Sequence, residues 1–189
     1  MRKLVHAQYV SLDGVVEDPS WTGPFFNDEL AALQRQALFA ADALVLGRRT
    51  FEQFAAVWPT MEDADGFAAR MNSMPKHVAS STPVDGWNGC GLGADPVRAV
   101  ADLKRFPGGD LLVYGSQTFA DALSAAGLVD EYRLMVNPVV VGSGAHVFAR
   151  AGALDGFGLL GSVRTSTGVV VLTYGRSTAS LGAAAAATA

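Results

Sequence analysis

The chain has one cysteine, little charge and no long apolar run. Cys90 is the single cysteine of 189 residues, which excludes an internal disulfide and a cysteine-based zinc cluster. Acidic residues outnumber basic ones by 18 to 14, whereas nucleic-acid binding requires a basic face. No apolar stretch reaches the roughly 18 residues of a membrane span, and the first apolar run, interrupted by His6 and Gln8, is too short for a signal peptide. We therefore expect a cytoplasmic protein with no metal site, no nucleic-acid partner and no membrane segment.

The residues that are present indicate one globular domain. Half of them are hydrophobic and 17% are charged, and the length suffices for one domain with a full core. Short apolar runs alternate with helical patterns, which is typical of an α/β fold. We expect a single domain over residues 1–176, followed by an Ala-rich tail over residues 177–189 that has no functional role.

The clearest functional signal follows the second apolar run. Residues 43–46 predict a short buried strand, and Gly47 allows a sharp turn after it. Thr50 and the glutamine three residues later stand at capping-box spacing, so we expect a helix to begin at Thr50. Arg48 and Arg49 then lie at a helix N-terminus, where backbone N–H and guanidinium groups together bind anions. The alternative is two solvated arginines on a surface turn.

A second turn of the same kind follows the predicted strand at residues 110–114. Gly115 comes directly after this strand, and Ser116 is placed to cap the next helix. Two strand–turn–helix units in one parallel sheet point out of the same carboxyl edge, which is where ligands of open α/β sheets bind. The sequence therefore predicts a ligand site at this edge.

The first strand and the segment after it supply candidates for the substrate side. Residues 3–11 predict a central strand, in which Gln8 is either a satisfied polar group or part of a polar pocket. Asp13 either forms an Asx turn with Gly14 or contacts a substrate. Residues 17–26 have no period and are expected to form a loop that covers a site.

Two aromatic and two acidic residues in the next segment have alternative interpretations. Trp21 and Phe25 either cover a planar ring or anchor their loop. Asn27 is expected to cap a helix that reaches about residue 39. Asp28 and Glu29, in its first turn, either complement the helix dipole or supply an acid to the site.

The end of the chain predicts further strands. Residues 131–141 are expected to form a long strand. Residues 157–164 and 168–174 flank a Thr-Ser-Thr turn and are expected to form a terminal antiparallel hairpin.

These motifs, in this order, resemble the dihydrofolate reductase-like family. The resemblance is closest to stand-alone relatives of the reductase half of the bifunctional riboflavin-biosynthesis deaminase-reductase. It implies a three-layer α/β fold, with a mostly parallel central sheet and an antiparallel C-terminal hairpin. The matching segments are Ser11-Leu12-Asp13-Gly14, the stretch from Asp42 to Phe51, Val113-Tyr114-Gly115-Ser116, and the stretch from Pro138 to Gly144 ahead of Phe148.

The resemblance also implies NADPH as the cofactor. Arg48 would pair with its 2′-phosphate, while Arg49 and Thr50 would sit on the diphosphate. The full set of implied cofactor-binding residues is Gly47, Arg48, Arg49, Thr50, Ser80, Ser81, Gly115, Ser116, Gln117 and Thr118. For the substrate side, the candidates are Asp13, Asp28 and Glu29 as catalytic residues and Gln8, Trp21 and Phe25 as substrate-binding residues.

Some residues depart from the family patterns. After the first turn stands Phe-Glu-Gln-Phe-Ala rather than the Asp-Pro-x-Leu-Thr usual in the riboflavin reductases. Pro24-Phe25-Phe26 replaces the Pro-Trp-x-Leu-Pro approach of dihydrofolate reductases. A single cysteine also excludes the zinc set of the deaminase half.

Three functions follow from these observations. The leading one is an NADPH-dependent reductase of a pterin- or pyrimidine-like small molecule, resembling 5-amino-6-(5-phosphoribosylamino)uracil reductase. A true dihydrofolate reductase is the first alternative, and a non-catalytic module that binds a nucleotide or small ligand is the second. The resemblance implies a homodimer.

Overall fold

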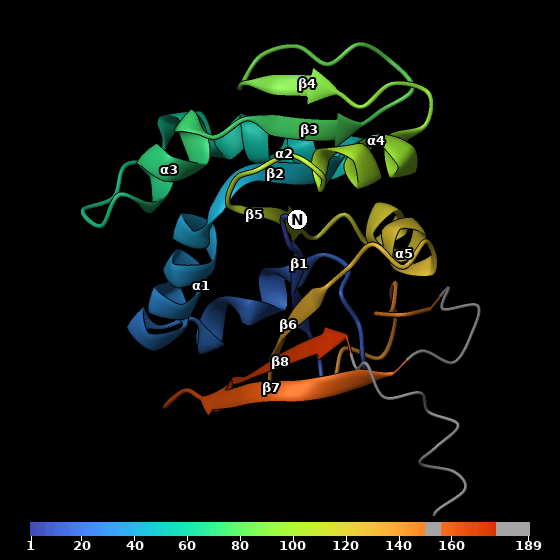
Figure 1. The fold of residues 1–189 in the computed structure, drawn as a ribbon. Helices are drawn as coiled ribbons and strands as arrows, with labels where there is room; N and C mark the ends of the chain where they lie inside the picture. Colours follow the sequence, from blue (N-terminus) through green and yellow to red (C-terminus); the bar gives the residue numbers. More distant parts are fainter. Residues whose placement is uncertain (150–155, 177–189) are drawn as a thin grey trace, which may run out of the picture.

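A single eight-stranded sheet organises the molecule (Figure 1). The computed structural model describes residues 1–149 and 156–176, so the Ala-rich segment at 177–189 lies outside the described residues. The strand order across the sheet is β4-β3-β2-β5-β1-β6-β8-β7. The strands are β1 (Leu4–Val10), β2 (Ala41–Gly47), β3 (Lys76–Ala79), β4 (Gly89–Gly91), β5 (Asp110–Tyr114), β6 (Glu131–Val136), β7 (Phe157–Arg164) and β8 (Val170–Arg176).

The sheet is parallel from β4 to β6 and antiparallel at its other end. Every pairing among the first six strands of this order is parallel. β8 runs antiparallel to β6, and β7 antiparallel to β8. The mostly parallel sheet with a C-terminal hairpin, expected from the sequence, is therefore confirmed.

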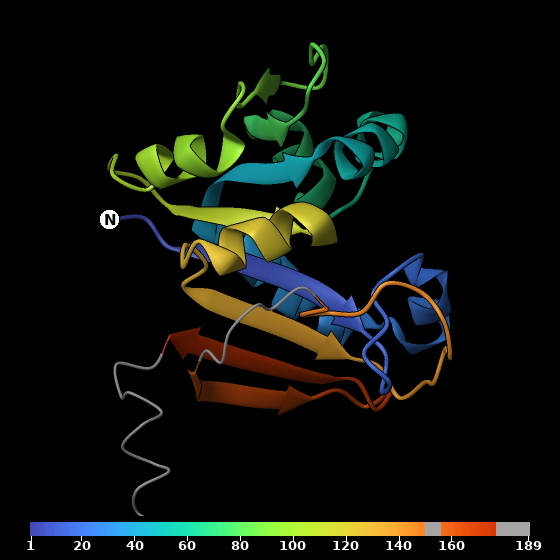
Figure 2. The same cartoon turned by 90° about the vertical axis from the view of Figure 1, so that its right-hand side faces the viewer.

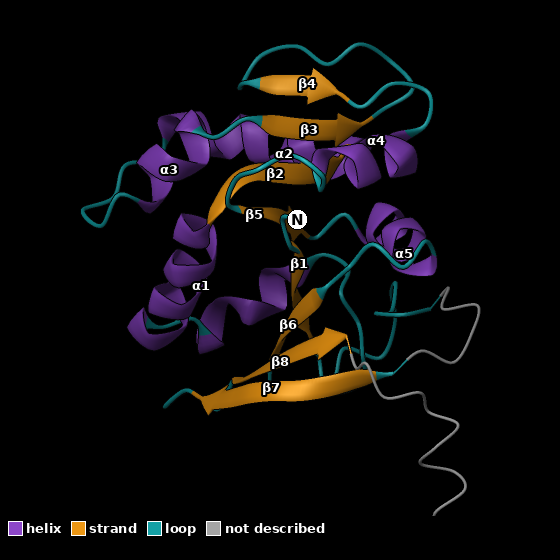
Figure 3. Ribbon diagram, in the orientation of Figure 1, coloured by secondary structure: helices purple, strands orange, loops and turns teal. Residues whose placement is uncertain are grey.

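Helices cover both faces of the sheet and complete three layers (Figure 3). One hydrophobic core joins α1, α2 and α3 to one face, and a second core joins α4 and α5 to the other. The central strand β2 serves both cores, because successive side chains alternate between the faces. The helices are α1 (Asp28–Ala40), α2 (Arg48–Val57), α3 (Phe67–Ser73), α4 (Pro96–Leu103) and α5 (Gln117–Ala125), with 3-10 helices η1 (Pro19–Phe25) and η2 (Trp58–Thr60).

Side chains cap two of the helices, and the cap at Asn27 was expected from the sequence. The Asn27 side chain accepts a hydrogen bond from the Leu30 N–H and begins α1. Asp95 caps α4 in the same way, with Pro96 in the first helical position. These caps fix where the chain turns back onto the sheet.

Some element boundaries differ from the sequence prediction. Helix α2 begins at Arg48 rather than Thr50, because the Thr50 hydroxyl bonds another segment. Strand β6 ends at Val136 rather than residue 141. There Pro138 lacks an N–H for the ladder, and the N–H groups of Val141 and Gly142 donate to Asp13. Between β3 and α4 the short strand β4, which no pattern predicted, pairs with β3.

An ion pair joins neighbouring segments at the amino edge of the sheet. Arg2 pairs with Asp42 and donates to the Gly109 carbonyl at 2.8 Å. Asp42 also accepts from the Gly109 N–H at 2.9 Å. A Cβ at Gly109 would lie 2.8 Å from the Ala40 carbonyl oxygen, so the segments meet too closely for a side chain. Figure 2 shows the N-terminus at the opposite end of the parallel strands from their carboxyl ends.

None of the helices in residues 1–149 and 156–176 is long and apolar enough to cross a bilayer.

Candidate active site

A cleft of about 1670 Å³ opens at the carboxyl edge of the parallel strands. Its walls come from the ends of β1, β2 and β5, from α1, η1 and α2, and from the loop after β6. The cleft lies where the two predicted strand–turn–helix units end. Of the predicted site residues, it is lined by Gln8, Trp21, Gly47, Arg48, Arg49, Thr50, Gly115, Ser116, Gln117 and Thr118.

The two turns are hydrogen-bonded to each other. The Gly47 N–H donates to the Ser116 hydroxyl at 2.9 Å, and the Ser116 N–H donates to the Thr50 hydroxyl at 3.2 Å. The Ser116 hydroxyl in turn donates to the Tyr114 carbonyl at 3.0 Å. Because Thr50 and Ser116 are engaged across the turns, neither caps its own helix.

Both helix N-termini therefore lack a side-chain cap. No side chain caps α2 or α5, and no acidic residue lies in the first turn of either helix. Their N–H groups and dipoles favour negative charge in the cleft. Gly115 and Ser116 have positive φ values of 52° and 56°, and this left-handed turn brings α5 to the edge.

The buried side chain of His6 contacts the second turn at Gly115. Its Nε2 lies 3.2 Å from the Gly115 carbonyl oxygen. Burial lowers the pKa of His6 to about 4, and its hydrogen bond to the Gly115 carbonyl counteracts only part of this effect. The ring is thus neutral at pH 7.

Arg48 is held beside the loop that follows β3. Its guanidinium donates to the Ser80 hydroxyl at 3.0 Å and the Pro83 carbonyl at 2.9 Å, and it also bonds the Thr82 hydroxyl. Glu52 forms an ion pair with it at 2.7 Å. The side chain remains 41% exposed, so its charge is oriented and accessible. Ser80 and Ser81 themselves do not line the cleft, and Ser81 is exposed.

Arg49 and Gln117 are less restrained. Arg49 is 79% exposed and lies 3.9 Å from a Glu17 carboxylate oxygen. The Gln117 amide donates to Asp121 at 2.7 Å, while its buried Oε1 has no partner. That acceptor is available to a ligand in the cleft.

The acidic candidates lie outside the cleft lining. Asp13 accepts hydrogen bonds from Ser11, Val141 and Gly142 at 2.6, 3.1 and 2.7 Å. These bonds, that from the Ser11 hydroxyl foremost, lower the pKa of Asp13 to about 2. Asp13 thus joins two loops as a carboxylate.

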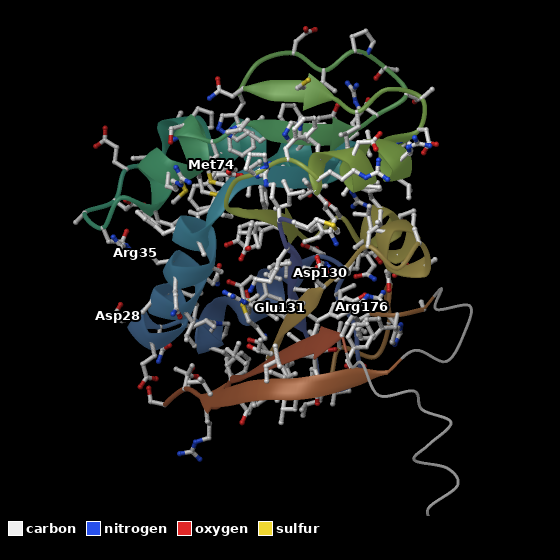
Figure 4. The ribbon with its side chains drawn as sticks, in the orientation of Figure 1. Asp28, Arg35, Met74, Asp130, Glu131 and Arg176 are labelled. Carbon is white, nitrogen blue, oxygen red and sulfur yellow. The ribbon has the colours of Figure 1, made fainter. Side chains whose placement is uncertain are left out.

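Glu29 and Asp28 do not line the cleft either. Glu29 accepts from the Ser166 N–H, the Ser166 hydroxyl and Asn27, and these bonds, the backbone bond foremost, lower its pKa. Asp28 is exposed, and Figure 4 shows it on the outer side of α1, away from the sheet. A catalytic role for these three acids stays a prediction.

The substrate candidates divide between the cleft and the core. Gln8 is buried, donates to the Tyr9 carbonyl at 3.0 Å and leaves Oε1 without a partner. The Trp21 ring N–H donates to the Glu17 carbonyl at 3.2 Å, which anchors the ring at the cleft. Phe25 packs against the hydrophobic core instead and does not line the cleft.

Sequence reasoning missed a group of aromatic and amide side chains on the α1 face of the sheet. Tyr9 follows Ala7 by two residues on β1, and Ala7 is paired with Tyr114 of β5, so both tyrosines point to this face. Gln34 of α1 donates to the Tyr9 hydroxyl, and the Phe54 ring lies 6.5 Å from that of Tyr114. The alternation of β1 marks Tyr9 as inward-facing, but its meeting with α1 and β5 requires the tertiary fold.

Within the residues that the structure describes, no three histidine, cysteine or acidic side chains gather as metal ligands.

A cleft at the carboxyl edge of a parallel sheet, with two uncapped helix N-termini, defines an α/β protein whose candidate site favours negative charge. The chain matches the family model of the RibD C-terminal domain over residues 2–171, so it belongs to that family. This match confirms the resemblance inferred from the sequence motifs.

Individual proteins are similar to this chain over most of its length. The uncharacterized protein YyaP of Bacillus subtilis (strain 168) is 27% identical over 177 residues, which are 92% of this chain and 94% of YyaP. A putative riboflavin biosynthesis protein from Shewanella sp. PV-4 superposes with a TM-score of 0.72 at 20% identity, covering 93% of this chain and 99% of that one. A pyrimidine reductase-like protein from Corynebacterium diphtheriae has a TM-score of 0.68 at 13% identity, covering 94% and 93%. At these identities the two structures establish a shared fold.

Proposed function

We propose that this protein is an NADPH-dependent reductase of a pyrimidine- or pterin-like heterocycle. The observation that carries the proposal is the pair of hydrogen-bonded turns, which direct two uncapped helix N-termini and Arg48 into one cleft. Membership of the RibD C-terminal domain family supports it.

The residues present fit a phosphorylated dinucleotide. The N–H groups of α2 and α5 would hold the diphosphate, and Thr50 and Ser116 fix the spacing of the two turns. Arg48, oriented by Ser80 and Glu52, would pair with the 2′-phosphate. When bound, reduced nicotinamide supplies the hydride. The chain's own task is to bind both partners, orient them and exclude water.

The proposal assigns no proton transfer to Asp13, Asp28 or Glu29. Asp13 and Glu29 are occupied by loop hydrogen bonds, and the bonds of Asp13 keep it ionised. Asp28 faces outward. A general acid must come within hydrogen-bond reach of the reacting atom, and none of the three lines the cleft.

The two alternatives differ from this proposal in measurable ways. A true dihydrofolate reductase would bind methotrexate tightly, whereas α1 presents Ala31 and Gln34 to the cleft and no acid. A non-catalytic module would bind NADPH without oxidising it in the presence of any pterin, folate or aminouracil substrate.

NADPH and NADH affinities of the natural protein and of Arg48→Ala test the cofactor assignment. A charge-assisted hydrogen bond contributes about 1.5–3 kcal/mol, so the variant should lose about 10- to 150-fold in NADPH affinity and little in NADH affinity. Arg98→Ala is the matched control, because Arg98 forms the same i,i+4 ion pair on α4. If the natural protein bound neither nucleotide, or bound both equally, the cofactor assignment would fail.

We also propose that the protein is a homodimer joined through its C-terminal strands. Strand β7 is the edge of the sheet, and Leu159, Leu160 and Val163 on it are 55%, 66% and 47% exposed. Natural proteins usually cover such an edge. A light-scattering mass near the 19.7 kDa of one chain would refute this proposal.

A further inference from the structure

The cleft carries positive charge at one end only. Among the described residues that line it, the basic side chains are Arg48 and Arg49, both in the first turn of α2, where the cofactor phosphates are proposed to bind. The part of the cleft between α1 and α3 is lined instead by Asp63 and Asp65, from the loop that leads into α3. A phosphate group on the substrate would meet no cation among these lining residues, because the cofactor engages both arginines.

The helix N-termini in this part of the cleft are closed to anions. The Ala68 N–H at the start of α3 donates to the Asp63 carboxylate, and the Phe67 N–H donates to Asp65 at 3.3 Å. Helix α1 is capped by Asn27 and has two acidic residues in its first turn. In α2 and α5, by contrast, no side chain caps the helix and no acid lies in the first turn. Bonded N–H groups and nearby carboxylates disfavour a further negative charge.

An aromatic row forms the wall between α2 and α3. Its members are Phe54, Trp58 and Phe67, with ring centroids 6.3 Å apart for the first pair and 5.4 Å for the second. All three rings are partly buried and line the cleft. Met61, next to the row, also lines the cleft and is 45% exposed. A planar apolar group that covers this surface removes it from water and packs against the rings.

We propose that the substrate carries no phosphate group and places an apolar aromatic substituent against Phe54, Trp58, Phe67 and Met61. The inference rests on the proposed reductase function and separates this chain from a reductase of 5-amino-6-(5-phosphoribosylamino)uracil. A phosphate monoester has a charge of about −1.5 to −2 at pH 7, and Asp63 and Asp65 disfavour it here. Met61 and Trp58 act as specificity-determining contacts.

Three probes that share a uracil ring test the inference by calorimetry on the full chain. Saturating NADPH occupies the two turns and Arg48 during the titration. 5-Aminouracil represents the ring alone, 6-(benzylamino)uracil adds a phenyl group, and 6-(ribitylamino)uracil 5′-phosphate adds a chain that ends in a phosphate. The natural protein should bind the benzyl probe about 10-fold more tightly than 5-aminouracil, because a phenyl group is buried. It should bind the phosphate probe no more tightly than 5-aminouracil.

Variants at Met61 change the expected preference in both directions. Met61→Ala should lose about 5-fold in affinity for the benzyl probe, because less apolar surface is covered, and should bind 5-aminouracil as before. Met61→Arg should gain about 5-fold for the phosphate probe, and added salt should cancel this gain.

Val57→Arg is the matched control for Met61→Arg. Val57, at the end of α2, is an exposed apolar residue like Met61, but it does not line the cleft. The control should bind all three probes as the natural protein does. A phosphate-probe gain in Val57→Arg equal to that in Met61→Arg would show a general charge effect and would count against the inference.

Three other results would overturn the inference. They are tighter binding of the phosphate probe than of the benzyl probe by the natural protein, unchanged benzyl-probe affinity in Met61→Ala, and no binding of the benzyl probe to the NADPH complex. The reductase proposal is judged separately, by NADPH affinity and turnover. If NADPH binds and is oxidised by a phosphate-bearing substrate, the reductase proposal stands and only the substrate inference fails.

Discussion

The two ends of the cleft are built in different ways. The phosphate end consists of two contiguous turns, Gly47–Thr50 and Gly115–Thr118, joined by hydrogen bonds between backbone N–H groups and hydroxyls. The substrate end is assembled from single residues of β1, α1 and β5 that meet only in the folded chain. The first end offers charge and backbone dipoles, while the second offers neutral phenol and amide groups. An anion is therefore expected at the first end, and the ring of the proposed substrate at the second.

The largest effect is expected when one core side chain is shortened under each end of the cleft. Leu30 of α1 and Leu123 of α5 are both fully buried, on opposite faces of the sheet. Leu30→Ala and Leu123→Ala should each lower the free energy of unfolding by about 2–5 kcal/mol, measured by urea denaturation.

Ligand affinities then separate the two variants. Leu30→Ala should weaken 5-aminouracil binding more than NADPH binding, because α1 carries Gln34. Leu123→Ala should do the reverse, because α5 carries the second turn. Equal losses of both ligands in both variants would show that the two ends do not behave as separate units.

A pH titration tests the support of the second turn. Folded His6 has a pKa of about 4, against about 6.5 in an unfolded chain, so the unfolded chain binds more protons between these values. Stability is therefore full above about pH 6.5 and falls towards pH 4, by about 1.4 kcal/mol per pH unit and about 3 kcal/mol in total. His6→Gln should lack this contribution in urea unfolding curves. The exposed His146→Gln is the control, and a His6→Gln profile parallel to the natural one would contradict the assignment.

The hydrogen bond between the two turns gives the smallest expected effect. Thr50→Val keeps the shape of the side chain but leaves the Ser116 N–H without its acceptor. We expect a loss of about 1 kcal/mol in stability and a few-fold weaker NADPH binding. Thr60→Val removes a hydroxyl that donates to the Val57 carbonyl at the end of α2, outside the cleft lining, and should change NADPH affinity little. If both variants bound NADPH equally well, the bond between the turns would not organise the phosphate end.

The difference between the two ends also explains which parts of the site were predictable from the sequence. A glycine turn after an apolar run and arginines before a helical pattern are local signals, so the phosphate end and the parallel sheet were predictable. Tyr9, Gln34 and Tyr114 are separated by 25 residues along the chain or more, and no local pattern brings them together. The surroundings of the acids could not be predicted from the sequence. Asp13 and Glu29 stand at positions that suit a catalytic acid, but each bonds a loop that comes more than a hundred residues later in the chain.

The ion pair of Arg2 with Asp42 has a practical consequence for handling the protein. It holds the first residues at the amino edge of the sheet, while the cleft opens at the carboxyl edge. A tether at Met1 would emerge on the side away from the cleft mouth. Protein immobilised on a sensor chip through this end would present its cleft to the flowing solution, in a uniform orientation and without steric hindrance from the surface.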